Sequence, residues 1–217
     1  FTLGKGMTMI PAGLFSYTGL QSVAIPDGIM QIDCGAFAGC NVTDIDLNHV
    51  VTIGENAFNS CKQLSSLVIP DSVTSIGFGA FSSCTSLSSV IISDSITFLT
   101  AESFRNCTSL NYVKLPQNLQ KFGYRAFAGC TTLEHIDIPG TVITNRTSSG
   151  PEKGYWGYDG GPFYQCSALR SFTLGKGMTT IPAGLFSYTG LQSVTIPNGI
   201  TQIDVGAFSG CSISSII

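Results

Sequence analysis

Apolar residues recur along this chain in a regular pattern, and most copies of the pattern are 21 to 23 residues long. A phenylalanine anchors each copy, and one interval of 36 residues interrupts the spacing. A near-constant period of this length indicates an array in which each unit packs against the next. The anchoring residues are Phe15, Phe37, Phe58, Phe81, Phe104, Phe127, Phe163, Phe186 and Phe208.

A working consensus of the repeat is AFxxCxxLxxVxIPxxVxxIG, and each part of it predicts a local structure. Apolar and other residues alternate through Leu67 and Ile69, which predicts a short strand with these two side chains on one face. Pro70 follows, and because proline has no N–H and a fixed φ, we expect it to end the strand. Gly77 indicates a tight turn, and the AFxxCxxL segment has room for a single helical turn.

One unit of this length cannot bury its own apolar side, whereas stacked units bury theirs in one continuous core. We therefore expect residues 1–217 to form a single repeat domain of about nine coils, with parallel strands about 4.8 Å apart. Residues 1–40 and 172–211 are identical at 34 of 40 positions, which indicates a duplicated block of coils. Because the sequence opens in the middle of the pattern, we expect it to be a fragment of a longer array.

Seven of the eight cysteines stand three residues after an anchoring phenylalanine, and Thr18 and Thr189 occupy the same position in their units. A position that accepts Cys or Thr favours a packed side chain that hydrogen-bonds to a turn, so we expect free, inert thiols. The chain contains no CxxC or CxxH spacing, so no metal site is expected.

The repeated pattern resembles the BspA-like leucine-rich repeats, also called the Treponema pallidum type. The resemblance covers the whole chain apart from one insertion, and departures such as Asp33 in the glycine position and Ser93 in the proline position are local. It implies a β-rich leucine-rich-repeat solenoid of the α/β horseshoe class. Parallel strands would line its concave face, and short turns or helical turns its convex side. It also implies a bacterial cell-surface or secreted protein that binds host or neighbouring macromolecules.

The composition excludes several classes of function. Charged residues make up 11% of the chain and the net charge is −3, so the chain has no basic field to hold nucleic acid or an anionic membrane. No apolar run approaches the ~20 residues of a membrane span, so we expect no membrane insertion in this segment.

The sequence gives little support for an enzymatic function. Asp44 and Asp46 would lie about 6.6 Å apart on one strand, a spacing that suits polysaccharide cleavage, but the adjacent strands carry no Arg or Lys there. His135 and Asp137 could activate a nucleophile, yet serines occur throughout the chain, so their proximity means little. We therefore expect no catalysis and no cofactor.

Binding residues are expected on the outward face of the strands, between the inward Leu, Val and Ile positions. Most of this face is small and weakly polar, with an acidic pair near the start of the chain and a mixed cluster on two neighbouring strands farther on. These candidates are Asp44, Asp46, Tyr112, Lys114, Glu134, His135 and Asp137.

The long interval contains an insertion within residues 142–161, which carries Tyr155, Tyr158 and the single tryptophan, Trp156. Exposed Trp and Tyr on a glycine-rich loop would form an interface hot spot or stack on sugars. Alternatively, the rings cover their own coil, since aromatic residues of long loops are often buried. The sequence leaves both readings open.

We expect a non-catalytic cell-surface or secreted module that binds an extracellular protein or glycan, such as host matrix, through the concave face and the insertion loop. A monomer is expected. The alternatives are an intracellular interaction scaffold and, more remotely, a polysaccharide-acting enzyme.

Overall fold

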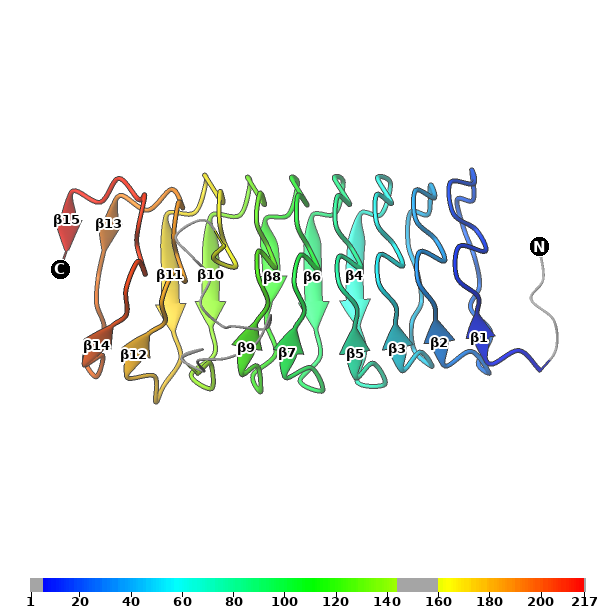
Figure 1. The fold of residues 1–217 in the computed structure, drawn as a ribbon, viewed down its shortest axis with the longest axis horizontal. Helices are drawn as coiled ribbons and strands as arrows, with labels where there is room; N and C mark the ends of the chain where they lie inside the picture. The colour runs from blue at the N-terminus through cyan, green and yellow to red at the C-terminus, as the bar shows by residue number, and fades with distance from the viewer. Residues whose placement is uncertain (1–5, 144–159, 217) are drawn as a thin grey trace.

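The computed structural model describes residues 6–143 and 160–216, which form an elongated parallel-strand β-solenoid (Figure 1). Successive coils follow one another along the long axis, from β1 (Met9–Ile10) at one end to β15 (Ser215–Ile216) at the other. The repeat expected from the sequence is thus a stack of coils. Strands of neighbouring coils pair in parallel within six short sheets, such as β4 with β6 and β6 with β8.

The first column of strands comes from the LxxVxI part of each repeat. Its burial alternates: Leu67 and Ile69 are buried while Ser66 and Val68 between them are exposed, which confirms the predicted facing. In register, Leu67 pairs with Val90 and Val90 with Val113, so equivalent residues lie side by side. The column contains β4 (Ser66–Ile69), β6 (Ser89–Ile92), β8 (Tyr112–Lys114), β10 (His135–Ile138), β11 (Ser171–Leu174), β13 (Ser193–Val194) and β15.

A second column of two-residue strands occupies the VxxIG part, where the sequence predicted only a turn. Gly77 and Gly123 follow these strands, and a Cβ on Gly77 would lie 2.5 Å from the backbone nitrogen of Glu55 in the preceding coil. Glycine is therefore required here because two backbones approach closely. The column contains β1, β2 (Gln31–Ile32), β3 (Thr52–Ile53), β5 (Ser75–Ile76), β7 (Phe98–Leu99), β9 (Lys121–Phe122), β12 (Thr180–Ile181) and β14 (Gln202–Ile203).

The helical turn considered for the AFxxCxxL segment is absent from the described residues, which contain no helix. Asn56 and Ser60, two residues before and after Phe58, have φ angles of 52° and 58°, in the left-handed region that interrupts a right-handed helix. The N–H groups of Asn56, Phe58 and Ser60 instead donate to carbonyls of the next coil, each at 2.8 Å. This segment is thus a third line of hydrogen bonds between coils.

The phenylalanines form a continuous ladder inside the coils. From Phe15 to Phe127 successive ring centroids lie 5.1–5.4 Å apart and the rings are nearly parallel. The insertion does not break the ladder, because Phe127 and Phe163 still stack at 5.6 Å. Around the rings the inward Leu, Val and Ile residues complete one hydrophobic core along the rod.

All eight cysteines are free, and the seven that follow an anchoring phenylalanine form a ladder beside the rings, whereas Cys34 is exposed. The thiol of Cys61 donates to the carbonyl of Phe37 at 3.1 Å, and Cys107 donates in the same way to Phe81 at 3.2 Å. Burial raises the pKa of the Cys61 and Cys107 thiols to about 12, so both remain protonated at neutral pH. The predicted role as packed hydrogen-bond donors is confirmed for the seven ladder cysteines, and Cys61 and Cys107 lack the thiolate character that reactivity needs.

Replacing Phe81 by Ala should lower the free energy of unfolding by about 3–5 kcal/mol, because a fully buried ring between two stacked neighbours leaves a cavity. Phe208→Ala in the last coil should cost less, because that ring is only partly buried. Chemical denaturation of both variants measures the difference, and equal losses would contradict the role given to the ladder.

Candidate binding surface on the strand face

The outward side chains of the first column form one surface, here called the strand face. At β4 and β6 this face is apolar, because Val68 is 57% exposed and lies beside Ile91, which is 38% exposed. On β8 the register places Lys114 next to Ile91 and Tyr112 next to Ser89. The face therefore changes from apolar to charged across three adjacent strands.

The structure brings together five of the predicted site residues. Tyr112 and Lys114 lie on β8, His135 and Asp137 lie on the neighbouring β10, and Glu134 directly precedes β10. All five are exposed. The neighbouring strands β8 and β10, with the residue before β10, thus present an aromatic ring, a cation, an imidazole and two carboxylates.

A hydrogen-bond network crosses from β10 to β11. The imidazole Nε2 of His135 lies 3.0 Å from Oδ1 of Asp137, and its Nδ1 lies 2.7 Å from Oγ of Ser171. The hydroxyl of Thr173 donates to the same Oδ1 of Asp137. Because His135 pairs with Ser171 and Asp137 with Thr173 in the strand register, the backbone itself sets this geometry.

These hydrogen bonds favour the charged form of Asp137. The bond from Thr173 lowers the pKa of the Asp137 carboxyl most, the bond from His135 lowers it further, and slight burial opposes both. Since folding lowers this pKa, the ionised carboxylate stabilises the fold at neutral pH. That contribution is lost as the pH falls from the ordinary Asp value through the lowered one.

Hydrogen bonds link Ser171 to His135 and His135 to Asp137. A serine, histidine and aspartate connected in this order is the arrangement that activates a serine nucleophile. Such a site also needs free backbone N–H groups near the serine to hold the oxyanion. Here the N–H groups of Arg170 and Ser171 both donate to the carbonyl of Glu134. These two N–H groups are therefore not available to an oxyanion, and the side chains of His135 and Asp137 are open to solvent.

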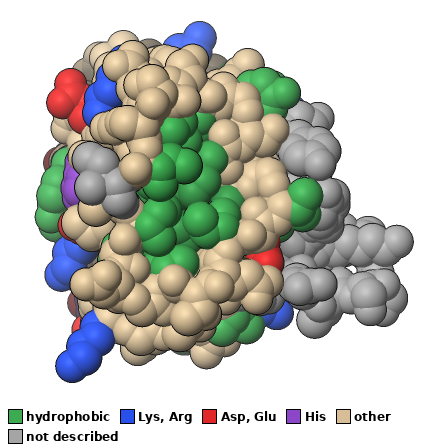
Figure 2. Space-filling model, turned by 90° about the vertical axis from the view of Figure 1, so that its left-hand side faces the viewer, with side chains coloured by type: hydrophobic (Ala, Val, Ile, Leu, Met, Phe, Trp, Pro, Cys, Tyr) green, Lys and Arg blue, Asp and Glu red, His purple; other side chains and the backbone are tan. Residues whose placement is uncertain are grey.

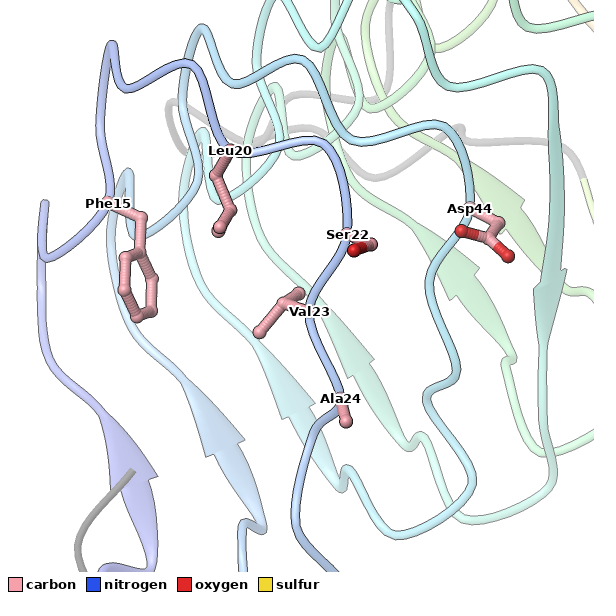
Figure 3. A pocket seen from close by; sticks show the side chains of 6 residues that line it. All are labelled: Phe15, Leu20, Ser22, Val23, Ala24 and Asp44. Atoms are coloured by element: carbon pink, nitrogen blue, oxygen red, sulfur yellow. The ribbon is translucent and has the colours of Figure 1, made fainter. Parts of the chain in front are cut away.

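The acidic pair lies apart from this cluster. Asp44 and Asp46 precede β4 along the rod, so the apolar strands β4 and β6 separate them from β8. Asp46 accepts a hydrogen bond from the backbone N–H of Asn48 at 3.0 Å, which makes it a turn-stabilising residue. Asp44 lines a hollow of about 380 Å³ at the first coil with Phe15, Leu20, Ser22, Val23 and Ala24 (Figure 3).

The predicted loop residues Tyr155, Trp156 and Tyr158 lie outside the described residues. Within the described ranges no three His, Cys, Asp or Glu side chains gather as a metal site would require. Those ranges also contain no helix that could cross a membrane.

The binding residues predicted from the sequence did not include Ser171 and Thr173, which the structure places in the cluster. Both occupy the outward positions of the repeat, and only the repeat alignment across the insertion places them beside His135 and Asp137. Serine and threonine are so common on this face that their type alone carried no signal.

The stacked strands, the inward aliphatic residues and the phenylalanine ladder define a leucine-rich-repeat solenoid. The family described as "BspA type Leucine rich repeat region (6 copies)" matches residues 32–149 and 159–217, so the chain belongs to this family. Proteins of this repeat family are typically non-catalytic binding proteins. The search of curated proteins gives no match.

Solved structures agree on the fold. A leucine-rich repeat protein from Bacteroides ovatus is 25% identical, with a TM-score of 0.66 over 99% of this chain and 65% of its own. A leucine rich cell surface protein from Faecalibacterium prausnitzii is 24% identical, with a TM-score of 0.50 over 96% of this chain and 62% of its own. The T. pallidum leucine rich repeat protein is 22% identical, with a TM-score of 0.54 over 84% of this chain and 77% of its own. The chain thus spans less than two thirds of the length of the first two.

The pKa of Asp137 offers a direct check on the network. In a carboxyl-carbon NMR titration, Thr173→Val should raise the Asp137 pKa towards the ordinary Asp value, and His135→Gln should raise it by a smaller amount. An Asp137 pKa that neither substitution moves would show that the network does not form in solution.

Proposed function

We propose that this chain is a non-catalytic binding module of a cell-surface or secreted protein, and that it recognises an extracellular protein or glycan through the strand face. The observation that carries the proposal is the juxtaposition of exposed apolar residues on β4 and β6 with the Tyr112, Lys114, His135 and Asp137 cluster on β8 and β10.

The chemistry of this surface supports recognition of a macromolecule. Tyr112 is 53% exposed and presents a large ring with a polar tip, a side chain enriched among interface hot spots. The nearby Val68 and Ile91 add apolar area. Lys114 and Asp137 offer opposite charges on the neighbouring strands β8 and β10. Such a mixture fits a ligand with both an apolar side and hydrogen-bonding groups.

Family membership supports the extracellular setting, because a similar structure belongs to a protein described as a leucine rich cell surface protein. An intracellular interaction scaffold would use the same strand face. The two functions differ in the ligand, so a screen against matrix proteins and glycans separates them.

The strand-face proposal predicts a selective loss of binding. After that screen has identified a ligand, Tyr112→Ala should weaken its binding about tenfold or more, as truncation of an exposed hot-spot ring does. Phe98→Ala is the matched control: its ring is 44% exposed but lies on β7 in the second column, so affinity should not change. Equal effects of the two variants, measured by calorimetry, would place the binding site elsewhere.

The insertion loop is a second expected contact. Replacing Trp156 and Tyr158 by Ala should lower ligand affinity and leave the melting temperature nearly unchanged, because exposed rings contribute little to folding. Calorimetry and thermal unfolding of the same variant test both parts. A large fall in melting temperature would mean that the rings cover their own coil.

A further inference from the structure

Charged side chains are few in this chain, and they lie on the outside of the rod. Figure 2, a view along the rod, shows the acidic, basic and histidine side chains around a hydrophobic centre. On the strand face, His135, Asp137, Ser171 and Thr173 join in one hydrogen-bond network across β10 and β11. The direction of each hydrogen bond decides which ligand groups this network can hold.

The directions follow from the ionised carboxylate of Asp137, which accepts hydrogen bonds and cannot donate them. The hydrogen between His135 and Asp137 is therefore carried by Nε2 of His135. In a neutral imidazole the other nitrogen, Nδ1, is then an acceptor, so Ser171 donates its hydroxyl to it. Thr173 donates its hydroxyl to Asp137 as well. All three donors of the network are thus used inside it.

The part of the network that faces solvent can only accept hydrogen bonds. Both bonds to Asp137 end on Oδ1, so Oδ2 keeps its lone pairs, and the Asp137 side chain is 76% exposed. The oxygens of Ser171 and Thr173 have each donated their one hydrogen and keep lone pairs too. A group bound here must therefore donate, and the carboxylate favours a donor with positive charge.

The side chains around the network add to this preference and also limit it. Tyr112 occupies on β8 the repeat position of His135, and its ring is 53% exposed, so a cation can lie over its face. Glu134, exposed directly before β10, adds a second carboxylate. Lys114 opposes a bound cation, because it occupies the repeat position of Asp137 and forms no ion pair with any described residue. Arg170 is held towards the following coil, where its Nη1 donates to two carbonyls at 2.8 and 2.6 Å.

We infer that the β10–β11 part of the strand face binds the ammonium or guanidinium group of a basic side chain on a protein partner. This inference rests on the proposed function and names the chemical group that the strand face recognises. A basic side chain supplies several donors and a positive charge at one point, which is what the acceptors and the carboxylate require. The apolar Val68 and Ile91 on β4 and β6 favour a protein, whose neighbouring apolar side chain would lie against them.

Protonation of His135 would reverse part of this pattern. An imidazolium donates from both nitrogens, so Nδ1 would donate to Ser171, and the Ser171 hydroxyl would become a donor that faces outward. A positive charge would also appear beside the bound cation. Histidine is the side-chain type whose charge changes between pH 5 and 8, so binding of a cation should weaken as the pH falls through that range. The charged groups that face the imidazole are Asp137, Lys114, Glu134 and Arg170.

NMR titration of the 217-residue chain with two small probes tests the inference. Nα-acetyl-arginine amide carries a guanidinium group, and Nα-acetyl-citrulline amide has the same shape without the charge. The ring signals of His135 and the carboxyl-carbon signal of Asp137 should shift in a saturable way with the arginine probe. The citrulline probe should bind about tenfold more weakly, because charge-assisted hydrogen bonds are the stronger kind.

Variants locate the probe. Asp137→Asn keeps an acceptor oxygen but removes the charge, so it should weaken the arginine probe about tenfold. Asp71→Asn is the matched control, because this exposed carboxylate also accepts a serine hydroxyl but lies in the turn after β4, so affinity should not change. Lys114→Gln should tighten binding about twofold to threefold, since it removes a like charge. Glu134→Gln, at an exposed position, replaces Asp137→Asn if circular dichroism shows that the latter is unfolded.

The pH arm and the probe pair give the decisive results. Affinity for the arginine probe should fall about threefold or more from pH 8 to pH 5, and His135→Gln should remove that dependence. Equal affinity for the two probes would mean that the face holds uncharged donors such as sugar hydroxyls, and it would overturn the inference, as would no binding of the arginine probe. A screened ligand that Tyr112→Ala weakens and Asp137→Asn does not would contradict this inference alone and leave the proposed function standing.

Discussion

The distance between coils is the constraint on which the rest of this structure depends. Parallel strands hold equivalent backbone positions about 4.8 Å apart, so nearly every side chain lies next to its own counterpart in the neighbouring coil. Stacked rings tolerate this spacing, as Phe58 and Phe81 do at 5.2 Å. A column of like charges would be destabilising at this spacing, because charges this close repel each other appreciably even at a solvent-exposed surface. The low charged fraction of 11% and the columns of Ser, Thr and Cys follow from that constraint.

The candidate site lies where the columns stop repeating. Ser66 and Ser89 continue one another on the strand face, but the next positions in this column are Tyr112, His135 and Ser171. Unlike neighbours can hydrogen-bond across strands in ways that identical neighbours cannot. The imidazole of His135 bridges Ser171 and Asp137 for this reason. The surface of this repeat fold is therefore most distinctive where the outward residues of neighbouring coils differ from one another.

The sequence predicted what the period of the side chains determines and missed what depends on single backbone angles. The inward facing of Leu67 and Ile69 and the packed thiols were predictable because every copy repeats them. The second strand column was not, since two residues such as Ser75 and Ile76 are too few to show an alternation. The left-handed angles fall on Asn56, Ser60 and Gly79 alike, so no residue type marks them in advance. The pairing of His135 with Ser171 needed the register across the insertion.

In this molecule, how deeply a side chain is buried depends on the coils that lie next to it and not on the residue alone. Ile32 and Ile203 have the same type, the same place in the repeat and nearly the same local sequence, yet one is fully buried and the other is half exposed. Only the adjacent coil differs, so the stability of each coil is chiefly a nearest-neighbour interaction. Phe81, stacked between Phe58 and Phe104, is buried in the same way by both of its neighbouring coils. A substitution in the ladder should therefore weaken the contacts of one coil with both of its neighbours, in proportion to the apolar area that it removes.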